Sequence, residues 1–389
     1  MTRVLLAAVI GLSACGGDGP KPLAPADAAP PMVGPDAITA PDTAMVLPGA
    51  ATDAAPPVVG PDAITAPDTA MVLPDAAAGV ANDAALDQAV AMDAGAPAAD
   101  QAPDGPAPAG EAVAIETTCT VPPVAMPPDV QLAFDVKYAS PAGQDQLLDL
   151  AWPAGGGTHP VVVLIHGGGW VMGDKMQHRQ AIHRLAGLGY VGVSINHRLA
   201  TTPENKFPAA VKDVRCALRW LRARAASYNI DPARAAIMGT SAGAHLAALT
   251  ATASTSTAFD SAECPTDAPV ELRAVLGYYG VYDLRLLALF PGGQVATFLG
   301  TSDPAVASLA SPVVHIDATD PPFLLIHGTA DNMAPSVFSQ SMRDALRSGG
   351  VPATMVELPG APHGFDVFDP MWPASTCTAL AFLRVRLMP

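Results

Sequence analysis

The distribution of aromatic residues divides this chain into a part that can build a hydrophobic core and a part that cannot. All 20 Phe, Trp and Tyr residues of the 389-residue sequence lie at Phe134 or later. Residues 16–115 contain 17 of the 41 prolines, 14 acidic residues and the single base Lys21. Such a segment buries too little apolar surface to offset the entropy lost on ordering. We therefore predict a disordered Pro/Ala/Asp-rich linker over residues 16–115 and a folded domain over residues 116–389.

The linker contains an internal duplication. The string GPDAITAPDTAMVLP occupies residues 34–48 and again residues 60–74, a period of 26 residues. A solenoid could have such a period, but two copies without a helical or strand pattern indicate a duplicated linker. Much of the formal net charge of −16 lies in this segment, so the folded part is only mildly acidic. No basic stripe with interleaved aromatic residues is present, and we expect no nucleic-acid partner.

Residues 1–15 form a separate unit. Arg3 precedes the apolar stretch Val4–Leu12, which is too short to cross a bilayer as a stable helix. The string LSAC that ends at Cys15 resembles a bacterial lipoprotein signal, which implies cleavage before Cys15 and attachment of lipid to it. The resemblance implies export and anchoring in the cell envelope, at the outer membrane because no aspartate follows Cys15. The chain would then meet the membrane only through its lipid, and the linker would hold the folded domain away from it.

Four cysteines remain in the folded part, and an exported chain could pair them. Their spacing does not resemble a metal site, since there is no C-x-x-C and no paired histidine nearby. Four cysteines allow three connectivities, which the sequence leaves open. We expect at least one disulfide, with buried free thiols as the alternative, and no metal. The four are Cys119, Cys216, Cys264 and Cys377.

Short β-branched segments alternate with longer helical patterns from about Val130 onward. This alternation predicts the α/β class, with a mostly parallel sheet of eight strands flanked by helices. Apolar residues at helical spacing also predict a helix over Pro208–Tyr228. The strand candidates are Gln131–Tyr138, Leu147–Trp152, Val161–His166, Val191–Asn196, Ala235–Gly239, Ala274–Tyr279, Phe323–His327 and Thr354–Leu358.

A serine flanked by glycines lies between one strand candidate and the next helical stretch. The string GTSAG at residues 239–243 ends the strand Ala235–Gly239 and leads into Ala244–Ala251. Such a turn lifts Ser241 Oγ clear of the sheet, and the following helix points the positive end of its dipole at the site. Ser241 is therefore a candidate nucleophile if a base can remove its proton. A small-residue turn without function is the alternative.

A second glycine cluster, the string HGGGW at residues 166–170, follows the strand candidate Val161–His166. Consecutive glycines leave backbone N–H groups unobstructed, which a carbonyl oxygen needs when it becomes an oxyanion. A plain glycine turn is the alternative. Together with the serine turn, the pattern resembles the HGGG-type oxyanion motif of α/β-hydrolase esterases. The resemblance implies that Gly168 and Gly169 donate to the oxyanion together with the N–H of Ala242.

Chain order selects the base and the acid, because the triad of that fold runs serine, acid, histidine. His363 is the last histidine and follows the final strand candidate. Asp331 lies four residues beyond the strand Phe323–His327 and could fix the tautomer of His363. The competing acid is Asp283, which we expect to cap a helix instead. The histidines that we expect to be structural are His166, His245 and His327.

About 260 residues carry a resemblance to one family. The strings HGGGW, PPFLLIHGTADNMAP and PGAPHGF, with the stretch around the serine turn, resemble α/β-hydrolase esterases related to the hormone-sensitive-lipase group. The bacterial feruloyl and acetylxylan esterase-like branch is especially similar. The resemblance implies an α/β-hydrolase fold and acyl transfer without a cofactor. We also expect a small cap over residues 282–322, in which four side chains could line an acyl pocket or simply belong to the core: Leu286, Leu287, Leu289 and Phe290.

Three functions follow from these expectations. The first is a serine carboxylic-ester hydrolase acting on short-chain acyl esters or on acetylated or feruloylated carbohydrates. The second is an amidase or formamidase with the same triad, and the third is a lipid-tethered binding protein without turnover. A complete set of Ser241, Asp331 and His363 argues against the third, since a silent protein would tolerate the loss of any member. The sequence leaves the natural ester and the oligomeric state open.

Overall fold

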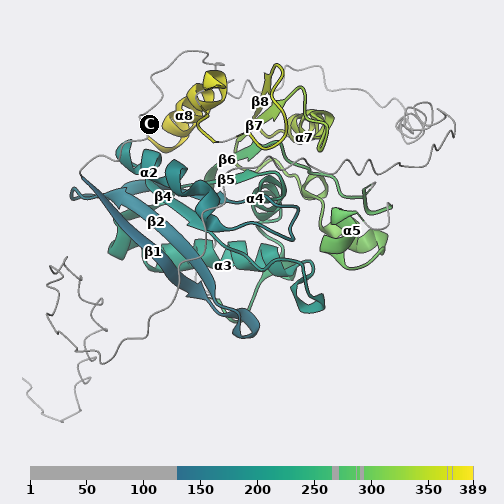
Figure 1. The fold of residues 1–389 in the computed structure, drawn as a ribbon, viewed down its shortest axis with the longest axis horizontal. Coiled ribbons are helices and arrows are strands. Elements are labelled where there is room, and N and C mark those ends of the chain that lie inside the picture. Colours follow the sequence, from purple (N-terminus) through teal and green to yellow (C-terminus); the bar gives the residue numbers. More distant parts are fainter. Residues whose placement is uncertain are drawn as a thin grey trace, which may run out of the picture. The chain divides into compact units, whose positions relative to one another are not determined.

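The folded domain is built around one β-sheet (Figure 1). The strand order of this sheet is β1-β2-β4-β3-β5-β6-β7-β8. The computed structural model describes residues 129–264, 271–285, 287–289, 293–365, 367–369 and 371–388. The prediction of eight strands in a mostly parallel sheet is confirmed within these residues. The strands are β1 (Val130–Ala139), β2 (Gln146–Pro153), β3 (His159–Ile165), β4 (Val191–Ile195), β5 (Ile230–Thr240), β6 (Leu272–Tyr278), β7 (Phe323–Gly328) and β8 (Ala353–Leu358).

Strand direction changes only on the β1 side of the sheet. β1 pairs with β2, and β2 with β4, in antiparallel fashion, whereas all pairs from β4 to β8 are parallel. Parallel strands are covered on both faces by their crossover helices and therefore become apolar throughout. The run Val161–Ile165 of β3 follows this rule, since each of its side chains is buried.

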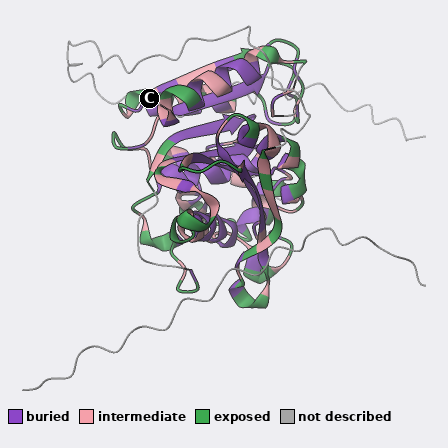
Figure 2. Cartoon of the chain, turned by 90° about the vertical axis from the view of Figure 1, so that its left-hand side faces the viewer, coloured by how far each residue is buried: buried purple, intermediate pink, exposed green. Residues whose placement is uncertain are grey.

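Two helix layers cover the two faces of the sheet, and buried residues line the strands between them (Figure 2). Alternate β3 residues belong to different layers, with Val163 in one cluster and Val162 in the other. One cluster contains side chains of α3 (Ala209–Ala223), α4 (Ala242–Thr252) and α7 (Val337–Ser348). The other contains side chains of α2 (Arg179–Gly187) and α8 (Pro373–Leu387).

The helix predicted over Pro208–Tyr228 ends earlier than expected. α3 stops at Ala223, and Ala225–Tyr228 forms a separate 3₁₀ turn. Asn229 then adopts a left-handed conformation (φ 55°), which an asparagine tolerates better than most residues and which directs the chain into β5. The apolar spacing persists past the end of the α-helix, so periodicity alone could not locate this boundary.

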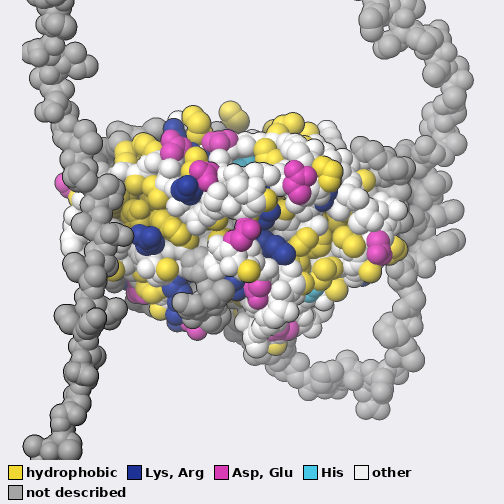
Figure 3. All heavy atoms as spheres, turned by 90° about the horizontal axis from the view of Figure 1, so that it is seen from below, with side chains coloured by type: hydrophobic (Ala, Val, Ile, Leu, Met, Phe, Trp, Pro, Cys, Tyr) yellow, Lys and Arg dark blue, Asp and Glu magenta, His cyan; other side chains and the backbone are white. Residues whose placement is uncertain are grey.

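An insertion between β6 and β7 occupies the region predicted to form a cap. It contains α5 (Gln294–Leu299) and α6 (Pro304–Leu309), with 3₁₀ turns at Leu287–Leu289 and Pro312–Val314. Asp303 caps α6 by accepting a hydrogen bond from the N–H of Ala305 at 2.8 Å. On the face shown in Figure 3, acidic and basic side chains are interspersed among apolar ones.

One disulfide is present within the described residues, as predicted, and joins Cys216 of α3 to Cys264. Cys377, which is also disulfide-bonded, is buried on α8, and Cys119 lies outside the described residues. The proposed signal with Cys15 and the duplicated linker also lie outside them. No helix in the described part of the chain is both long enough and apolar enough to span a bilayer.

Candidate active site

Ser241 lies at the junction between β5 and α4, with backbone angles of φ 51° and ψ −119°. Its N–H donates to the carbonyl oxygen of Tyr278 on β6 at 2.8 Å. Glycines are required on both sides of this turn. A Cβ at Gly239 would lie within 3.0 Å of the Gly243 carbonyl, and a Cβ at Gly243 would lie equally close to the carbonyl of Ile165. The turn therefore depends on β3, β5 and α4 approaching at van der Waals distance.

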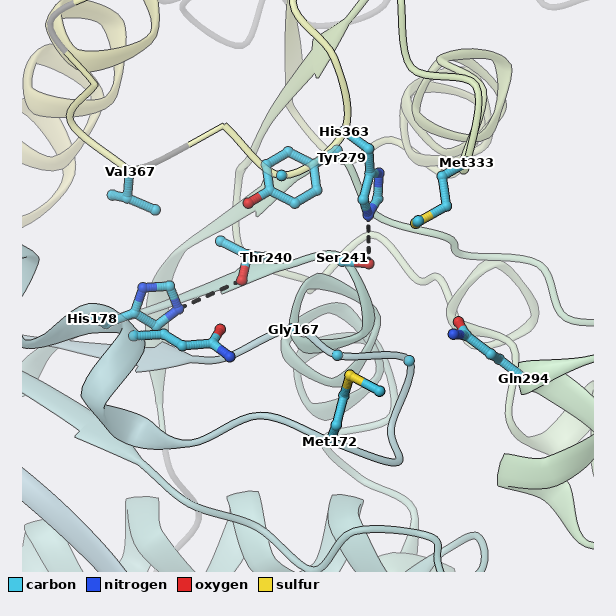
Figure 4. A pocket seen from close by; sticks show the side chains of 14 residues that line it. Gly167, Met172, His178, Thr240, Ser241, Tyr279, Gln294, Met333, His363 and Val367 are labelled. Atoms are coloured by element: carbon cyan, nitrogen blue, oxygen red, sulfur yellow. Dashed lines mark hydrogen bonds between the residues drawn. The ribbon is translucent and has the colours of Figure 1, made fainter. Parts of the chain in front are cut away.

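The structure brings Ser241, His363 and Asp331 together from three distant parts of the sequence. His363 Nε2 lies 3.0 Å from Ser241 Oγ, as the dashed line in Figure 4 marks. His363 Nδ1 lies 2.7 Å from Asp331 Oδ2. Because a carboxylate only accepts, this contact places a proton on Nδ1 and leaves Nε2 free to accept from the serine hydroxyl. Asp331 follows β7 and His363 follows β8, so both come from the edge at which parallel strands end.

The carboxylate of Asp331 is buried and surrounded by donors. Oδ1 accepts hydrogen bonds from the N–H groups of Met333 at 3.0 Å and Ala334 at 2.8 Å. Burial acts to raise the pKa of Asp331, but hydrogen bonds from Ala334 and His363 outweigh it and hold the pKa below its ordinary value. The competing candidate, Asp283, instead pairs with the guanidinium of Arg285 at 2.6 Å and accepts from its N–H at 3.1 Å.

The loop that carries Gly168 and Gly169 lies beside the turn at Ser241. Both glycines have left-handed backbones, with φ of 113° and 57°. The Gly168 carbonyl accepts from the N–H groups of Val171 and Met172, each at 3.1 Å, which curls the loop. Within the described residues, the N–H groups of Gly168, Gly169 and Ala242 donate to no backbone or side-chain acceptor. Those donors remain available to a ligand.

Two cavities of about 450 and 380 Å³ meet at Ser241 and His363. The larger is the pocket drawn in Figure 4, and its polar side chains give us the name polar arm: Gln177, His178, Thr240 and Tyr279. The smaller we call the apolar arm, after the side chains of Trp170, Val281, Leu287, Val295 and Phe338. A ligand bound at Ser241 could therefore place one group in each arm.

Of the four side chains expected to line an acyl pocket, the structure places Leu287 on the wall of the apolar arm. Leu286, Phe290 and the side chain of Leu289 lie outside the described residues. The insertion also contributes Gln294, whose amide reaches over Gly169 and borders both arms.

Sequence reasoning missed several residues of the cleft. Gln294 begins a six-residue helix, and Met333 lies two residues beyond Asp331 with 74% of its surface exposed. His178 borders the polar arm from a short 3₁₀ turn, 3.5 Å from Thr240 Oγ1, and burial lowers its pKa to about 4. Gln294 and His178 belong to no motif, whereas Met333 lies within the string PPFLLIHGTADNMAP at residues 321–335. Only the position of Met333 beside the candidate acid could have pointed to it.

His166 occupies the base of the glycine loop. Its ring stacks on that of His197 with centroids 4.5 Å apart, and its Nδ1 lies 2.8 Å from the Gly167 carbonyl oxygen. Burial lowers the pKa of both imidazoles, to about 3 for His197. A neutral, buried pair of rings fits a structural role. Among the described residues, no three His, Cys, Asp or Glu side chains gather as metal ligands would.

Comparison with known proteins assigns this chain to a family. Residues 148–346, more than half of the chain, match the BD-FAE family. The esterase LipQ of Mycobacterium tuberculosis is 35% identical over 246 residues, which are 60% of this chain and 57% of LipQ. LipM of the same organism, a probable carboxylic ester hydrolase, is 35% identical over 58% of this chain and 53% of its own length. The chain thus spans little more than half the length of these curated relatives.

Solved structures extend the similarity to the fold. The propionate-bound esterase Est2 of Thermogutta terrifontis superposes with a TM-score of 0.58 at 28% identity, over 67% of this chain and 97% of Est2. A truncated carbohydrate esterase from gut microbiota superposes with a TM-score of 0.54 at 26% identity, over 65% of this chain and 95% of its own. The domain has the α/β-hydrolase fold, and the chain belongs to the BD-FAE family.

Proposed function

We propose that this chain is a serine carboxylic-ester hydrolase that works through an acyl-enzyme. One observation carries the proposal: a hydrogen-bonded path runs from Asp331 Oδ2 through His363 to Ser241 Oγ, beside a loop with free N–H groups. A nucleophile, a base, an acid and an oxyanion site are the parts that acyl transfer requires. The names of LipQ, LipM and Est2 as esterases or ester hydrolases support it.

In the first half of the reaction, Ser241 Oγ attacks the ester carbonyl carbon while His363 Nε2 takes the hydroxyl proton. The carbonyl oxygen becomes an oxyanion and accepts hydrogen bonds from the N–H groups of Gly168, Gly169 and Ala242. The carbon–oxygen bond to the alcohol then breaks, and the imidazolium of His363 returns the proton to the departing alcohol. Asp331 stabilises this imidazolium and holds its orientation.

In the second half, water takes the place of the alcohol. His363 removes a proton from the water as its oxygen attacks the acyl carbon, and a second oxyanion forms at the same donors. The bond to Ser241 Oγ then breaks, the serine recovers its proton from His363, and the carboxylic acid leaves. The cycle consumes one water for each ester and needs no cofactor.

The two arms of the cleft suggest the substrate class. The apolar arm has a volume of about 380 Å³, which suits a small acyl group, and the polar arm offers amide, imidazole and hydroxyl partners for a hydroxylated group. Est2 has been solved with propionate, and another structural neighbour is named a carbohydrate esterase. We therefore propose that the substrates are short-chain acyl esters, or acetylated or feruloylated carbohydrate esters.

Location is a further part of the proposal. We propose that the chain is exported and anchored in the cell envelope through lipid on Cys15, with residues 16–115 as the tether. Cells fed with labelled palmitate should incorporate label into the wild-type chain and not into Cys15→Ala. Equal labelling of the two would contradict lipidation at this residue.

One assay tests the activity. The purified chain is expected to hydrolyse p-nitrophenyl acetate and butyrate, and Ser241→Ala should lose this activity. Acyl anilides presented in parallel test the amidase alternative, which requires anilide turnover in the wild type that is lost in Ser241→Ala. Absence of turnover in the wild type, or unchanged turnover in Ser241→Ala, would refute the esterase proposal. The first of these outcomes is the one expected for a silent binding protein.

A further inference from the structure

His245, outside the path from Asp331 to Ser241, connects three segments around the site. It lies on the first turn of α4, and its side chain is fully buried. Its Nδ1 accepts a hydrogen bond from the indole Nε1–H of Trp170 at 3.1 Å, and its Nε2 donates to the carbonyl oxygen of Ala310 at 2.7 Å. Since an indole N–H only donates and a carbonyl only accepts, these partners select the neutral tautomer with its proton on Nε2.

Trp170 ends the loop that carries the oxyanion donors. It directly follows Gly169 and has a φ of 62°, a conformation that a bulky residue keeps only when its surroundings hold it. Its ring stacks on Phe298 of α5 with centroids 4.7 Å apart, and it meets the ring of His245 edge-on at 5.2 Å. The hydrogen bond to His245 therefore ties the end of this loop to the helix that begins after the nucleophile.

The backbone and the insertion complete the connection. The N–H of His245 donates to the carbonyl oxygen of Ser241 at 3.2 Å, so the residue that holds Trp170 is bonded to the nucleophile's own peptide unit. Ala310 directly follows α6, in the insertion that also supplies walls of the apolar arm. His245 thus contacts the oxyanion loop, the nucleophile turn and the insertion at the same time.

We propose that His245 is a positioning residue, which sets the oxyanion N–H groups of Gly168 and Gly169 relative to Ser241 by holding Trp170. The inference rests on the proposed ester hydrolysis and adds a residue that never touches the substrate. Oxyanion donors act only within about 2.7–3.1 Å of the developing charge. A shift of this loop therefore lowers kcat more than it changes KM, because the interaction strengthens in the transition state.

The surroundings of His245 keep its imidazole neutral, as the proposed role requires. Burial lowers the pKa of His245 to about 4, despite the opposing effect of the Ala310 carbonyl. The ring is therefore neutral near pH 7, and the lone pair on Nδ1 stays available to the indole of Trp170.

Three substitutions of His245 distinguish the effects of its two side-chain hydrogen bonds on turnover. His245→Phe keeps a ring and removes both nitrogens. His245→Asn can place an amide oxygen near the position of Nδ1, which preserves the acceptor for Trp170, and His245→Gln can place an amide nitrogen near Nε2, which preserves the donor for Ala310. For p-nitrophenyl acetate we expect kcat to fall about tenfold in His245→Phe, with KM within about twofold of wild type. His245→Asn should regain most of the lost kcat, and His245→Gln should not.

A matched control and a spectroscopic signal accompany the kinetics. His315 also bonds a backbone carbonyl beside α6, since its Nε2 lies 2.9 Å from the Leu309 oxygen, but its ring faces Phe259. His315→Phe should keep the wild-type kcat. In ¹⁵N-labelled protein, the indole N–H signal of Trp170, assigned with Trp170→Phe, should shift in His245→Phe and remain near its wild-type position in His245→Asn.

Three results would overturn the inference in protein that circular dichroism shows to be folded. His245→Phe could keep the wild-type kcat, His245→Asn could lose as much kcat as His245→Phe, or the Trp170 signal could be unaffected by His245→Phe. A wild-type chain without esterase activity would instead count against the proposed function, and the Trp170 signal would still decide whether the hydrogen bond exists.

Discussion

His327 Nε2 lies 3.1 Å from Asp331 Oδ2, and both side chains are completely buried. The same nitrogen lies 2.6 Å from the Ala334 carbonyl oxygen, and His327 Nδ1 lies 2.7 Å from Ser339 Oγ. Burial lowers the pKa of His327. A neutral ring with its proton on Nε2 therefore closes the loop from Asp331 to Ala334 and leaves the carboxylate little freedom to turn away from His363.

The acid assignment is the first prediction. In Asp331→Asn the amide cannot stabilise the imidazolium of His363 or fix its tautomer, so kcat on p-nitrophenyl acetate should fall by about 10⁴, with KM little changed. Asp283→Asn is the matched control, because Asp283 pairs with Arg285, and it should retain wild-type kcat. Loss of turnover in Asp283→Asn with activity retained in Asp331→Asn would reverse the assignment.

The second prediction concerns the close approach of strands and helix at the nucleophile turn. A Cβ at Gly243 would collide with the carbonyl of Ile165, a backbone atom that cannot move aside without displacing β3. Gly243→Ala should therefore lower the free energy of unfolding by about 2–3 kcal/mol, as measured by urea denaturation. Gly155→Ala provides the comparison, since a Cβ there meets no atom within 4 Å, and its midpoint should match the wild type.

The third prediction tests the apolar arm as the acyl site. Leu287→Trp adds volume to a wall of this arm, so the ratio of kcat/KM for p-nitrophenyl hexanoate to that for the acetate should fall about tenfold. Val314→Trp introduces the same side chain at an exposed position of the same insertion, and its ratio should stay that of the wild type. An unchanged ratio in Leu287→Trp would place the acyl chain elsewhere, with the polar arm as the remaining site.

The fourth prediction concerns pH and stability at Asp320. Burial, and to a smaller extent the charge of Asp317, raise the pKa of Asp320 to about 7 although the N–H of Asp317 opposes the shift. Between the unfolded value near 4 and this value, the folded state binds more protons than the unfolded state. Stability contributed by this group is therefore complete below about pH 4 and is lost as the pH rises to about 7.

Asp320→Asn removes that loss because an amide does not ionise. The unfolding free energy of the variant minus that of the wild type should increase by about 1–2 kcal/mol from pH 4 to pH 8, a value reduced for solvent screening near the surface. Urea denaturation at the two pH values measures it, and the pH 4 data serve as the internal control. A difference that does not change with pH would show that folding does not raise the pKa of Asp320.

The strands were the most predictable part of the fold. Uninterrupted apolar runs such as Val161–Ile165, which are rich in β-branched residues, have few alternatives once both faces are covered, so the eight strands could be located from local pattern. The order β1-β2-β4-β3 could not, because it depends on which strands pair over long distances in the chain.

Some residues of the cleft could be predicted from the sequence, and others could not. Ser241, Asp331 and His363 stand in strings that follow the serine, acid, histidine order of the α/β-hydrolase fold, and the structure brings them within hydrogen-bond reach. Gln294 and His178 border the cleft only because short helical segments fold back over it, and no local pattern marks them. The sequence alone could not decide against the competing acid Asp283, because its ion pair with Arg285 is seen only in the structure.

The left-handed backbone of Ser241 has a consequence for how this protein is selected. A non-glycine residue at φ 51° and ψ −119° carries on the order of 1–3 kcal/mol of unfavourable conformational energy, which glycine would largely avoid. A chain with glycine at this position would then be the more stable one, although it could not react. Serine at this position therefore serves the proposed chemistry at the expense of thermodynamic stability.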